Sequence, residues 1–230
     1  MKILIVSATS TEMLPLIDFL EKEGIKSNDN VYSFRQNDIY ILITGIGMIS
    51  MTFSVTRYCS LNKIDLAINA GIGGAFDPEC VLGSVFNITR DRIADLGVEF
   101  PDGNFKDIFE MKLLEKDEFP YKDGWLYSNT KTDLFPSLPK VSGVTVNMVS
   151  GNMHTIQKIR CKYSPHIESM EGSGFFYVCN LLDIPCIQIR SVSNHIEPRN
   201  RENWKILEAV KNLNHTLIQF LKDDYSKVKA

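Results

Sequence analysis

Six short apolar segments rich in β-branched residues constrain the fold of this chain more than any other feature. They read KILIVSA, IYILITG, DLAINAG, SVFNITR, GVTVNMVS and CIQIRSVS. Strands that are covered on both faces have this nearly continuous apolar composition, because neither face meets water. The sequence therefore predicts a central sheet that is buried on both sides.

Helical patterns lie between these segments. They span residues 11–24, 48–61, 171–182 and 204–221, and Thr9 or Ser10 is placed to cap the first. Strands that alternate with helices predict an α/β fold with a central mixed, largely parallel sheet flanked by helices. A chain of 230 residues can form one core, so a single domain over residues 1–230 is expected. Residues 100–140, rich in Pro, Asp and Lys, are predicted to form an irregular excursion from it.

Charge and cysteine content indicate which kind of ligand the protein binds and in which compartment it acts. The net charge is -3 and the pI about 5.8, so no basic surface for a nucleic acid is indicated and a small ligand is favoured. The five cysteines are odd in number and contain no C-x-x-C pair, which argues against a disulfide framework or a structural zinc site and favours reduced core thiols. No apolar run reaches the length of a membrane span, and the first residues do not resemble a signal peptide. We therefore expect a cytoplasmic protein that does not bind membranes.

Polar residues and glycines follow the apolar segments. Ligands of α/β sheets bind beyond the carboxyl ends of the strands, so these residues are the candidates for chemistry. They lie in SATSTEM, TGIGM, NAGIGGAF, SGNMH and RSVSNHIEP. The G-x-G of Gly45 and Gly47 lacks the third glycine of a dinucleotide fingerprint, so tight strand-to-helix turns are the simpler interpretation.

Two acids stand at the starts of predicted helices. Glu12 follows the first strand, and Glu171 precedes the small residues GSG. Either acid could simply stabilise a helix N-terminus through the helix dipole. However, small residues allow a ligand to approach closely, and a carboxylate at the end of a central strand can act as a general base on water. The sequence alone leaves both interpretations open.

Several segments together resemble a known family. TGIG, NAGIGGAF, SMEGSGFFYVC and RSVSNHI, in this order after a first loop ending in Glu12, are similar to the nucleoside phosphorylase and nucleosidase superfamily. The resemblance runs from Met1 to about Leu221, and residues 100–140 match poorly. It implies an enzyme without a metal or organic cofactor that cleaves the N-glycosidic bond between a purine and a ribose. The implied substrate is futalosine of the alternative menaquinone pathway, which would lose hypoxanthine.

The resemblance gives each candidate residue a role. Departure of the base leaves an oxocarbenium-like sugar, so the site should stabilise positive charge on the ribose. Glu12 would deprotonate the attacking water, and Met170 and Glu171 would contact the ribose hydroxyls. Arg190 would hold the water or the neighbouring acid, with a structural ion pair as the alternative. Further substrate contacts are expected from Ile46, Gly47, Gly71, Ile72 and Ser193.

Asn194 departs from the pattern of adenine-specific nucleosidases, in which an Asp at this position hands a proton to the purine N7. A carboxamide cannot deliver a proton, but its NH₂ group can donate to a 6-oxo group while its carbonyl accepts from a protonated N7. A rotated amide could also pair with adenine. We expect Asn194 to favour hypoxanthine release, and an Asx turn that closes the loop is the structural alternative.

Water is expected to be the nucleophile. Phosphorylases of this superfamily hold phosphate with arginines and a hydroxyl near the end of the third strand, where this chain has Asn69 and Ile72. A phosphate dianion would be poorly compensated there beside two carboxylates. Ile72 also replaces a serine that some nucleosidases place around the water.

Four positions give weaker predictions. Trp204 matches an aromatic residue near the sugar, although it could equally pack in the core at the start of the last helix. His154 matches an aromatic residue near the base, although a single His is more often structural. Arg199 and Arg201 could bind the benzoate-bearing arm on C5′ of futalosine or could be solvated loop charges.

Other functions stay open at this point. The alternatives are a methylthioadenosine or adenosylhomocysteine nucleosidase, a purine nucleoside phosphorylase and a non-catalytic nucleoside sensor, because a fold does not determine a function. The resemblance also implies a homo-oligomer, with C₂ as the simplest symmetry.

Overall fold

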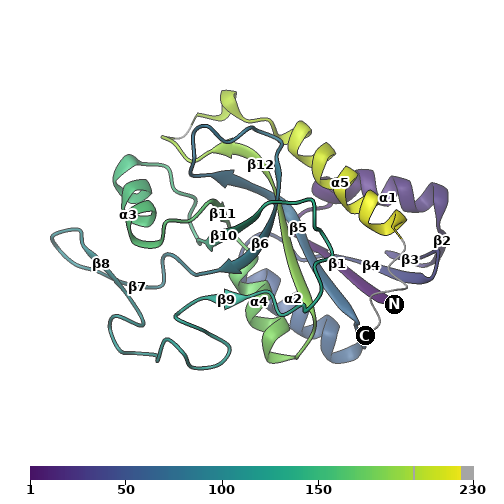
Figure 1. The fold of residues 1–230 in the computed structure, drawn as a ribbon, viewed down its shortest axis with the longest axis horizontal. Helices are drawn as coiled ribbons and strands as arrows, with labels where there is room; N and C mark the ends of the chain where they lie inside the picture. Colours follow the sequence, from purple (N-terminus) through teal and green to yellow (C-terminus); the bar gives the residue numbers. More distant parts are fainter. Residues whose placement is uncertain (199, 224–230) are drawn as a thin grey trace.

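The computed structural model describes residues 1–198 and 200–223, which form a sheet between two layers of helices (Figure 1). The helices are α1 (Ser10–Glu23), α2 (Met48–Leu61), α3 (Met153–Tyr163), α4 (Gly172–Leu181), the short 3₁₀ helix η1 (Arg201–Asn203) and α5 (Ile206–Lys222). The strands are β1 (Lys2–Ser7), β2 (Ile25–Asn28), β3 (Val31–Phe34), β4 (Asn37–Ile43), β5 (Leu66–Ala75), β6 (Val85–Asp91), β7 (Gly97–Glu99), β8 (Phe105–Asp107), β9 (Leu126–Tyr127), β10 (Lys140–Thr145), β11 (Ile167–Ser169) and β12 (Cys186–His195).

Strands β4, β1, β5 and β12 lie side by side and run parallel at the centre of the sheet. The antiparallel strands β3 and β2 extend one edge, and β6 runs antiparallel to β12 on the other side. The predicted mixed, largely parallel sheet with flanking helices is confirmed.

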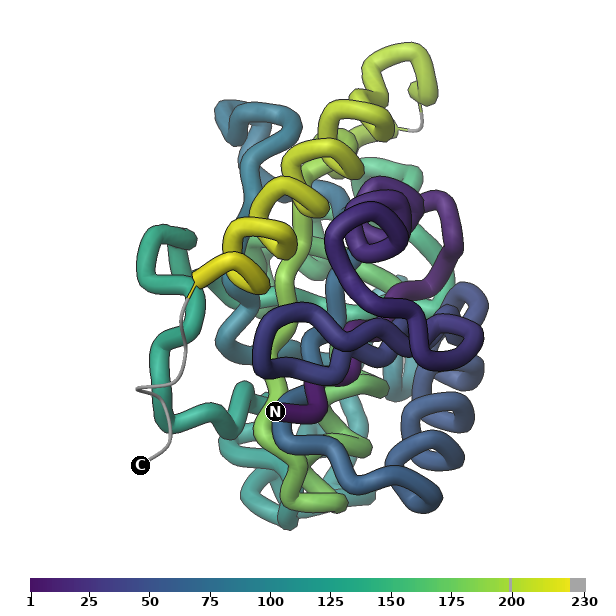
Figure 2. Tube along the Cα trace, turned by 90° about the vertical axis from the view of Figure 1, so that its right-hand side faces the viewer, coloured from purple at the N-terminus to yellow at the C-terminus, as the bar shows by residue number. Residues whose placement is uncertain are grey.

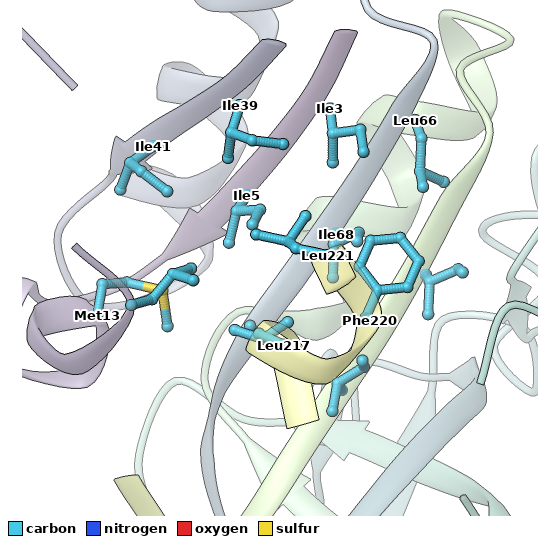
Figure 3. Packing of buried hydrophobic residues seen from close by; sticks show 14 of the residues in the cluster. Ile3, Ile5, Met13, Ile39, Ile41, Leu66, Ile68, Leu217, Phe220 and Leu221 are labelled. Carbon is cyan, nitrogen blue, oxygen red and sulfur yellow. The ribbon is translucent and has the colours of Figure 1, made fainter. Parts of the chain in front are cut away.

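Successive side chains of each strand point to opposite faces of the sheet, which explains why a layer of helices covers each face. Ile3 and Ile5 of β1 pack on one face with α1 and α5, whereas Leu4 and Val6 pack on the other face with α2 and α4. Figure 3 shows the first face, where Leu217 of α5 lies over the isoleucines of the central strands. Figure 2 brings α1 and α5 to the viewer side by side. Both faces of the sheet are therefore apolar, as the composition of the strands predicted.

One end of the sheet closes on itself. Strand β10 pairs with β6, β11 pairs with β10, and β11 also pairs antiparallel with the last residues of β5. Strands β5, β12, β6, β10 and β11 thus form a ring. A Cβ on Gly73 would lie 2.9 Å from the carbonyl oxygen of Glu168, so β11 can approach β5 this closely because residue 73 has no side chain.

This closure corrects two expectations about strand ends. NAGIGG was expected beyond the third strand but lies inside β5, and Asn194 was expected in a loop but lies inside β12. Both strands continue because their last residues find partners in the ring: His195 of β12 is in register with Ala75 of β5, which is also in register with Ile167 of β11. The side chains that follow the apolar segments are thereby fixed on paired backbone.

Helix boundaries agree with the predictions for α1, α2 and α4 to within two residues, and Thr9 is the N-cap of α1. The last helix, predicted over residues 204–221, is α5 and also agrees to within two residues, and residues 201–203 before it form the short helix η1. Helix α3 was not predicted, and the strand predicted through Ser150 ends at Thr145. The five cysteines are free, but Cys161 is exposed and is therefore not the core thiol that was expected.

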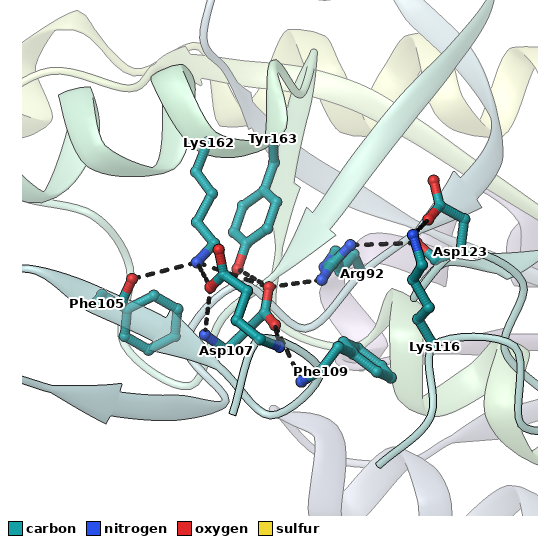
Figure 4. A network of polar contacts seen from close by, with 9 residues as sticks. Arg92, Phe105, Asp107, Phe109, Lys116, Asp123, Lys162 and Tyr163 are labelled. Carbon is teal, nitrogen blue, oxygen red and sulfur yellow. Dashed lines mark hydrogen bonds and ion pairs between the residues drawn. The ribbon is translucent and has the colours of Figure 1, made fainter. Parts of the chain in front are cut away.

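The excursion was predicted over residues 100–140. Strands β7 and β8, between β6 and β9, form a separate two-stranded sheet, whereas β9 pairs with β6 of the main sheet. A polar network anchors the excursion to α3 (Figure 4). The buried carboxylate of Asp107 accepts from Arg92 at 2.6 Å and from the Tyr163 hydroxyl at 3.3 Å, and Lys162 lies 3.7 Å away. The excursion is thus attached to the domain at a specific place, which its sequence did not indicate.

Candidate functional site

The site lies where the central parallel strands reach their carboxyl ends. Helix α1 starts after β1 and carries Glu12, α2 starts after β4 behind Gly47, and β5 and β12 supply Gly71 and Arg190. Helix α4 enters the same region with Glu171 as its N-cap. This is the end of an α/β sheet at which ligands bind.

Glu12 is held by four hydrogen-bond donors. One oxygen, Oε1, accepts from the backbone N–H of Ile72 at 3.0 Å. The other, Oε2, accepts from the Ser7 hydroxyl at 3.1 Å, from the Thr9 hydroxyl at 2.7 Å and from the Thr9 N–H at 3.0 Å. The side chain is buried, with 8% of the residue exposed. These contacts fix the carboxylate between β1 and β5.

Glu171 reaches across to the loop before α2. Its Oε1 accepts a hydrogen bond from the backbone N–H of Gly47 at 3.0 Å. Gly47 has a φ of 93°, a conformation that favours glycine and that turns its N–H toward the acid. Burial raises the pKa of Glu171, and the neighbouring Glu12 raises it further, whereas Arg190 and the Gly47 N–H oppose the shift. Glu171 therefore binds its proton more tightly than an ordinary glutamate.

Arg190 forms the floor of the site and is fully buried. Its Nη1 donates to the carbonyl oxygens of Ile189 at 3.1 Å and Asn69 at 3.3 Å, and its Nη2 donates to the side-chain oxygen of Asn69. Within residues 1–198 and 200–223, its Nε has no hydrogen-bond partner. Burial lowers the pKa of Arg190, and the carboxylates of Glu171, Glu12 and Asp91 act against this.

Gly71 brings the acid and the cation together. A Cβ on this residue would lie 3.0 Å from Oε1 of Glu12 and 3.6 Å from Nη1 of Arg190. Both groups thus approach the same point on β5, where a larger residue would displace one of them. Glu12, Glu171 and Arg190 form one buried electrostatic cluster, since each of the acids affects the pKa of Arg190.

Asn194 is half-buried near the end of β12, with its amide oriented by its neighbours. Its Nδ2 donates to the carbonyl oxygen of His195 at 2.9 Å, and its Oδ1 accepts from the Ser193 hydroxyl at 2.8 Å. Each atom keeps one further hydrogen-bonding position. Residues 149–151, Asn200 and Trp204 line a small cavity together with Asn194.

The remaining predicted residues differ in how they relate to this cluster. Gly47, Gly71 and Ile72 belong to the cluster through the contacts given above, and Ser193 orients Asn194. Trp204 joins the cavity at Asn194, and Met170 is half-buried directly before Glu171. Ile46 is exposed in the loop before α2.

Two of the weaker candidates lie outside the cluster. His154 is exposed in the first turn of α3, and a Cβ on Gly103 would lie 3.3 Å from its Nε2. The structure thus places it against the excursion. Arg201 is exposed in η1 with its guanidinium 5.9 Å from the Trp204 ring, and Arg199 lies outside the described residues.

Two buried acids near the site were missed by sequence reasoning. Asp91 ends β6 and accepts hydrogen bonds from Thr145 and Ser173. Glu168 in β11 accepts from the Ser150 N–H at 2.9 Å and from its hydroxyl at 2.5 Å, and so holds the loop that lines the cavity at Asn194. A charged residue within an apolar segment was the only signal for either acid.

Within residues 1–198 and 200–223, no group of three or more His, Cys, Asp or Glu side chains is arranged to hold a metal ion. No helix in the same part of the chain is long and apolar enough to cross a membrane.

A sequence profile of the phosphorylase superfamily matches residues 2–222. The chain belongs to the phosphorylase superfamily. Among curated members, it is 25% identical over 216 residues to the futalosine hydrolase of Thermus thermophilus, with 90% of this chain and 87% of that protein aligned.

Two solved structures of the superfamily share the fold. A futalosine hydrolase of Helicobacter pylori aligns with a TM-score of 0.77 at 13% identity, covering 96% of this chain and 97% of that one. A variant of the Helicobacter pylori nucleosidase MTAN with 5′-methylthioadenosine in its active site aligns with a TM-score of 0.78 at 14% identity, covering 96% and 98%. Since the two scores are nearly equal, the fold alone does not distinguish these activities.

Proposed function

We propose that this chain is a hydrolase of the N-glycosidic bond of purine nucleosides, with futalosine as its substrate and hypoxanthine and dehypoxanthine futalosine as its products. The observation that carries the proposal is that Glu12 and Arg190 meet at Gly71, and that Glu171 lies near enough to act on the charge of Arg190. The similarity to the Thermus thermophilus futalosine hydrolase along most of the chain supports the choice of substrate.

Glu12 is the proposed general base. Its Oε1 accepts from the Ile72 N–H and its Oε2 accepts from three donors, so the carboxylate is held in one orientation. A water bound at the remaining position of Oε1 would lose a proton to Glu12 as it attacks the anomeric carbon. Arg190 keeps the backbone of β5 at Asn69 in place below this water.

Glu171 is the proposed partner of the ribose hydroxyls, together with Met170. Its Oε1 is occupied by the Gly47 N–H, which leaves Oε2 to accept from the sugar. As the base departs, the ribose gains positive charge, and a buried carboxylate stabilises this charge more strongly than water would. Glu171 thus binds the transition state more tightly than the substrate.

The environment of Asn69 favours water over phosphate as the nucleophile. Its Nδ2 donates to the carbonyl oxygen of Val6 at 3.2 Å, and its Oδ1 accepts from Arg190. The side-chain amide of Asn69 is therefore engaged with Val6 and Arg190, and both Nη atoms of Arg190 donate to protein oxygens rather than to an anion. A phosphate dianion at this place would also face the carboxylates of Glu12 and Glu171.

The proposed enzyme acts in the cytoplasm as a homo-oligomer. In this proposal, Arg199 and Arg201 recognise the benzoate of the C5′ arm. A negatively charged arm needs a cation at the mouth of the site, and Arg201 stands beside Trp204, which lines the cavity at Asn194. Light scattering after size-exclusion chromatography tests the assembly.

The reaction is tested by incubating the purified protein with futalosine, inosine and 5′-methylthioadenosine, with and without inorganic phosphate. We expect free hypoxanthine from futalosine and a reducing sugar in both conditions. A sugar 1-phosphate that forms only with phosphate would identify a phosphorylase instead. Release of adenine alone would identify a methylthioadenosine nucleosidase, and binding without cleavage of any nucleoside would favour a sensor.

A further inference from the structure

Asp91 is a fully buried carboxylate that the proposed mechanism does not use. It ends β6, and its Oδ1 accepts from the hydroxyls of Thr145 and Ser173, each at 2.7 Å. Its Oδ2 accepts from the side-chain amide of Gln188 at 2.9 Å. Three side-chain donors from three different elements, β10, α4 and β12, thus meet at one acid.

Two of these contacts hold the first turn of α4. The Ser173 N–H donates to the Thr145 hydroxyl at 2.8 Å, and both the Thr145 and the Ser173 hydroxyls donate to Asp91. Asp91, Thr145 and Ser173 therefore form a closed hydrogen-bonded ring that includes a backbone group of the helix. A Cβ on Gly172 would collide with the carboxylate of Asp91, so the backbone packs directly on the acid at this point.

Glu171 immediately precedes these two residues. It is the N-cap of α4, and its carbonyl oxygen accepts the N–H of Phe175 at 3.1 Å. The position of its Cα is therefore set by a turn whose next two residues are fixed on Asp91. From there the side chain reaches Gly47, on the other side of the site.

We propose that Asp91 is a positioning residue of the hydrolytic site, which fixes the first turn of α4 and thereby the point from which Glu171 reaches the ribose. This inference rests on the proposed function, because it assigns Glu171 to the ribose hydroxyls. A displacement of about 1 Å in such a group lowers catalysis by up to about 100-fold, so the position of the turn matters for rate.

The network indicates which substitution is conservative. Oε1 of Gln188 is buried and has no hydrogen-bond partner within residues 1–198 and 200–223. In Asp91→Asn the remaining oxygen can still accept from Thr145 and Ser173, and the new NH₂ group can donate to Gln188 once that amide rotates. Asp91→Asn thus keeps the ring, whereas Asp91→Ala removes it.

The test compares inosine with 2′,3′-dideoxyinosine, which lacks the hydroxyls that Glu171 would bind. We expect Asp91→Ala to lower kcat/KM for inosine by about 10 to 100-fold and to affect the dideoxy substrate much less. Asp91→Asn should restore most of the rate. Combined with Glu171→Gln, Asp91→Ala should add little further loss, because both changes remove the same interaction.

Equal losses on both substrates would overturn the proposal, because a general loss of folded enzyme lowers all rates alike. Multiplicative effects of Asp91→Ala and Glu171→Gln would overturn it as well. Asp107→Asn serves as a matched control, since this acid is buried in the excursion network and should leave the ratio of the two rates unchanged. If Asp91→Ala does not fold, Ser173→Ala, which removes one donor, should show the same substrate dependence on a smaller scale.

Failure of the proposed function has a different signature. Wild-type protein that cleaves no nucleoside would end the assignment of Glu171 to the ribose. In that case hydrogen exchange at residues 172–176 still tests the clamp, because Asp91→Ala should accelerate it and Asp91→Asn should not. Unchanged exchange in Asp91→Ala would overturn the positioning role whatever the activity.

Discussion

The Oε1 atom of Glu12 and the backbone N–H of Ile72 lie 3.0 Å apart, although 60 residues separate them in the sequence. This bond joins the start of α1 to β5 and aims the acid at the sheet end where Glu171 and Arg190 also lie. Three further donors, from Ser7 and Thr9, take the other oxygen. A neutral amide could not accept all four.

We therefore expect Glu12→Gln to lower kcat for nucleoside hydrolysis by about 100 to 10,000-fold, because it removes the general base. Steady-state release of hypoxanthine measures the effect. Glu23→Gln, at an exposed position of the same helix, is the control and should keep the wild-type rate. A Glu12→Gln enzyme that retains full activity would exclude Glu12 as the base.

Glu171 should make the stability of the protein depend on pH. Burial raises its pKa, so the folded protein binds this proton more tightly than the unfolded chain does. In the range between the unfolded and the folded pKa, the free energy of unfolding must then fall as pH rises. Glu171→Gln should be more stable than wild type at neutral pH, and the gain should vanish below about pH 4, where an unfolded glutamate is protonated too. Urea unfolding at both pH values measures this, and an equal gain at both would contradict the raised pKa.

Sequence patterns predicted the central layers well because local periodicity and burial agree there. The runs that contain Ile3 to Val6 and Leu66 to Ala70 are covered on both faces, and such runs have few alternatives. The segment predicted as a strand to Ser150 failed for a tertiary reason. Asn147 turns away after Thr145, since its N–H and side chain bind Asp95, which is 52 residues earlier.

Sequence reasoning selected the two acids of the candidate site but not the residues that hold its elements in place. Glu12 and Glu171 follow strand ends or begin helices, and family motifs identify both. Asp91 and Glu168 acquire their roles from partners far away in the sequence, Ser173 and Ser150 respectively, so no local pattern marks them. Helix α3 was overlooked because Ile156, Ile159 and Tyr163 are its only buried residues among polar ones.

Arg201 should act on the substrate arm alone. Its guanidinium is exposed and lies 5.9 Å from the ring of Trp204, which lines the cavity at Asn194. Arg201→Ala, alone or with Arg199→Ala, should raise KM for futalosine by about tenfold and leave the KM for inosine unchanged, because inosine has no charged arm. Initial rates on the two substrates provide the measurement. An equal rise in both KM values would dispose of the idea.

Asp107 should contribute stability rather than activity. Burial alone would raise its pKa, but the backbone N–H of Glu110 and the cations Arg92 and Lys162 together lower it. Because the folded pKa lies below the unfolded one, this stabilisation is present above the unfolded pKa and is lost as pH falls through the folded pKa. Asp107→Asn should lower the free energy of unfolding by about 1 to 3 kcal/mol at neutral pH and by less in acid. Urea unfolding at several pH values measures this loss. A loss that does not depend on pH would contradict the lowered pKa.

Asn194 should determine which purine leaves. Its Nδ2 must face the carbonyl oxygen of His195, since a rotated amide would set two acceptors against each other, and the Ser193 hydroxyl holds the other end. The amide therefore presents its remaining donor and acceptor in one fixed order.

Asn194→Asp replaces the donor by an oxygen next to the same carbonyl, which favours a protonated carboxyl that can deliver its proton to N7 of a leaving adenine. We expect the ratio of kcat/KM for 5′-methylthioadenosine over inosine to rise by about tenfold or more. Asn194→Ala, which has neither group, should lower both rates without that rise, and a ratio unchanged in Asn194→Asp would show that this position does not select the base.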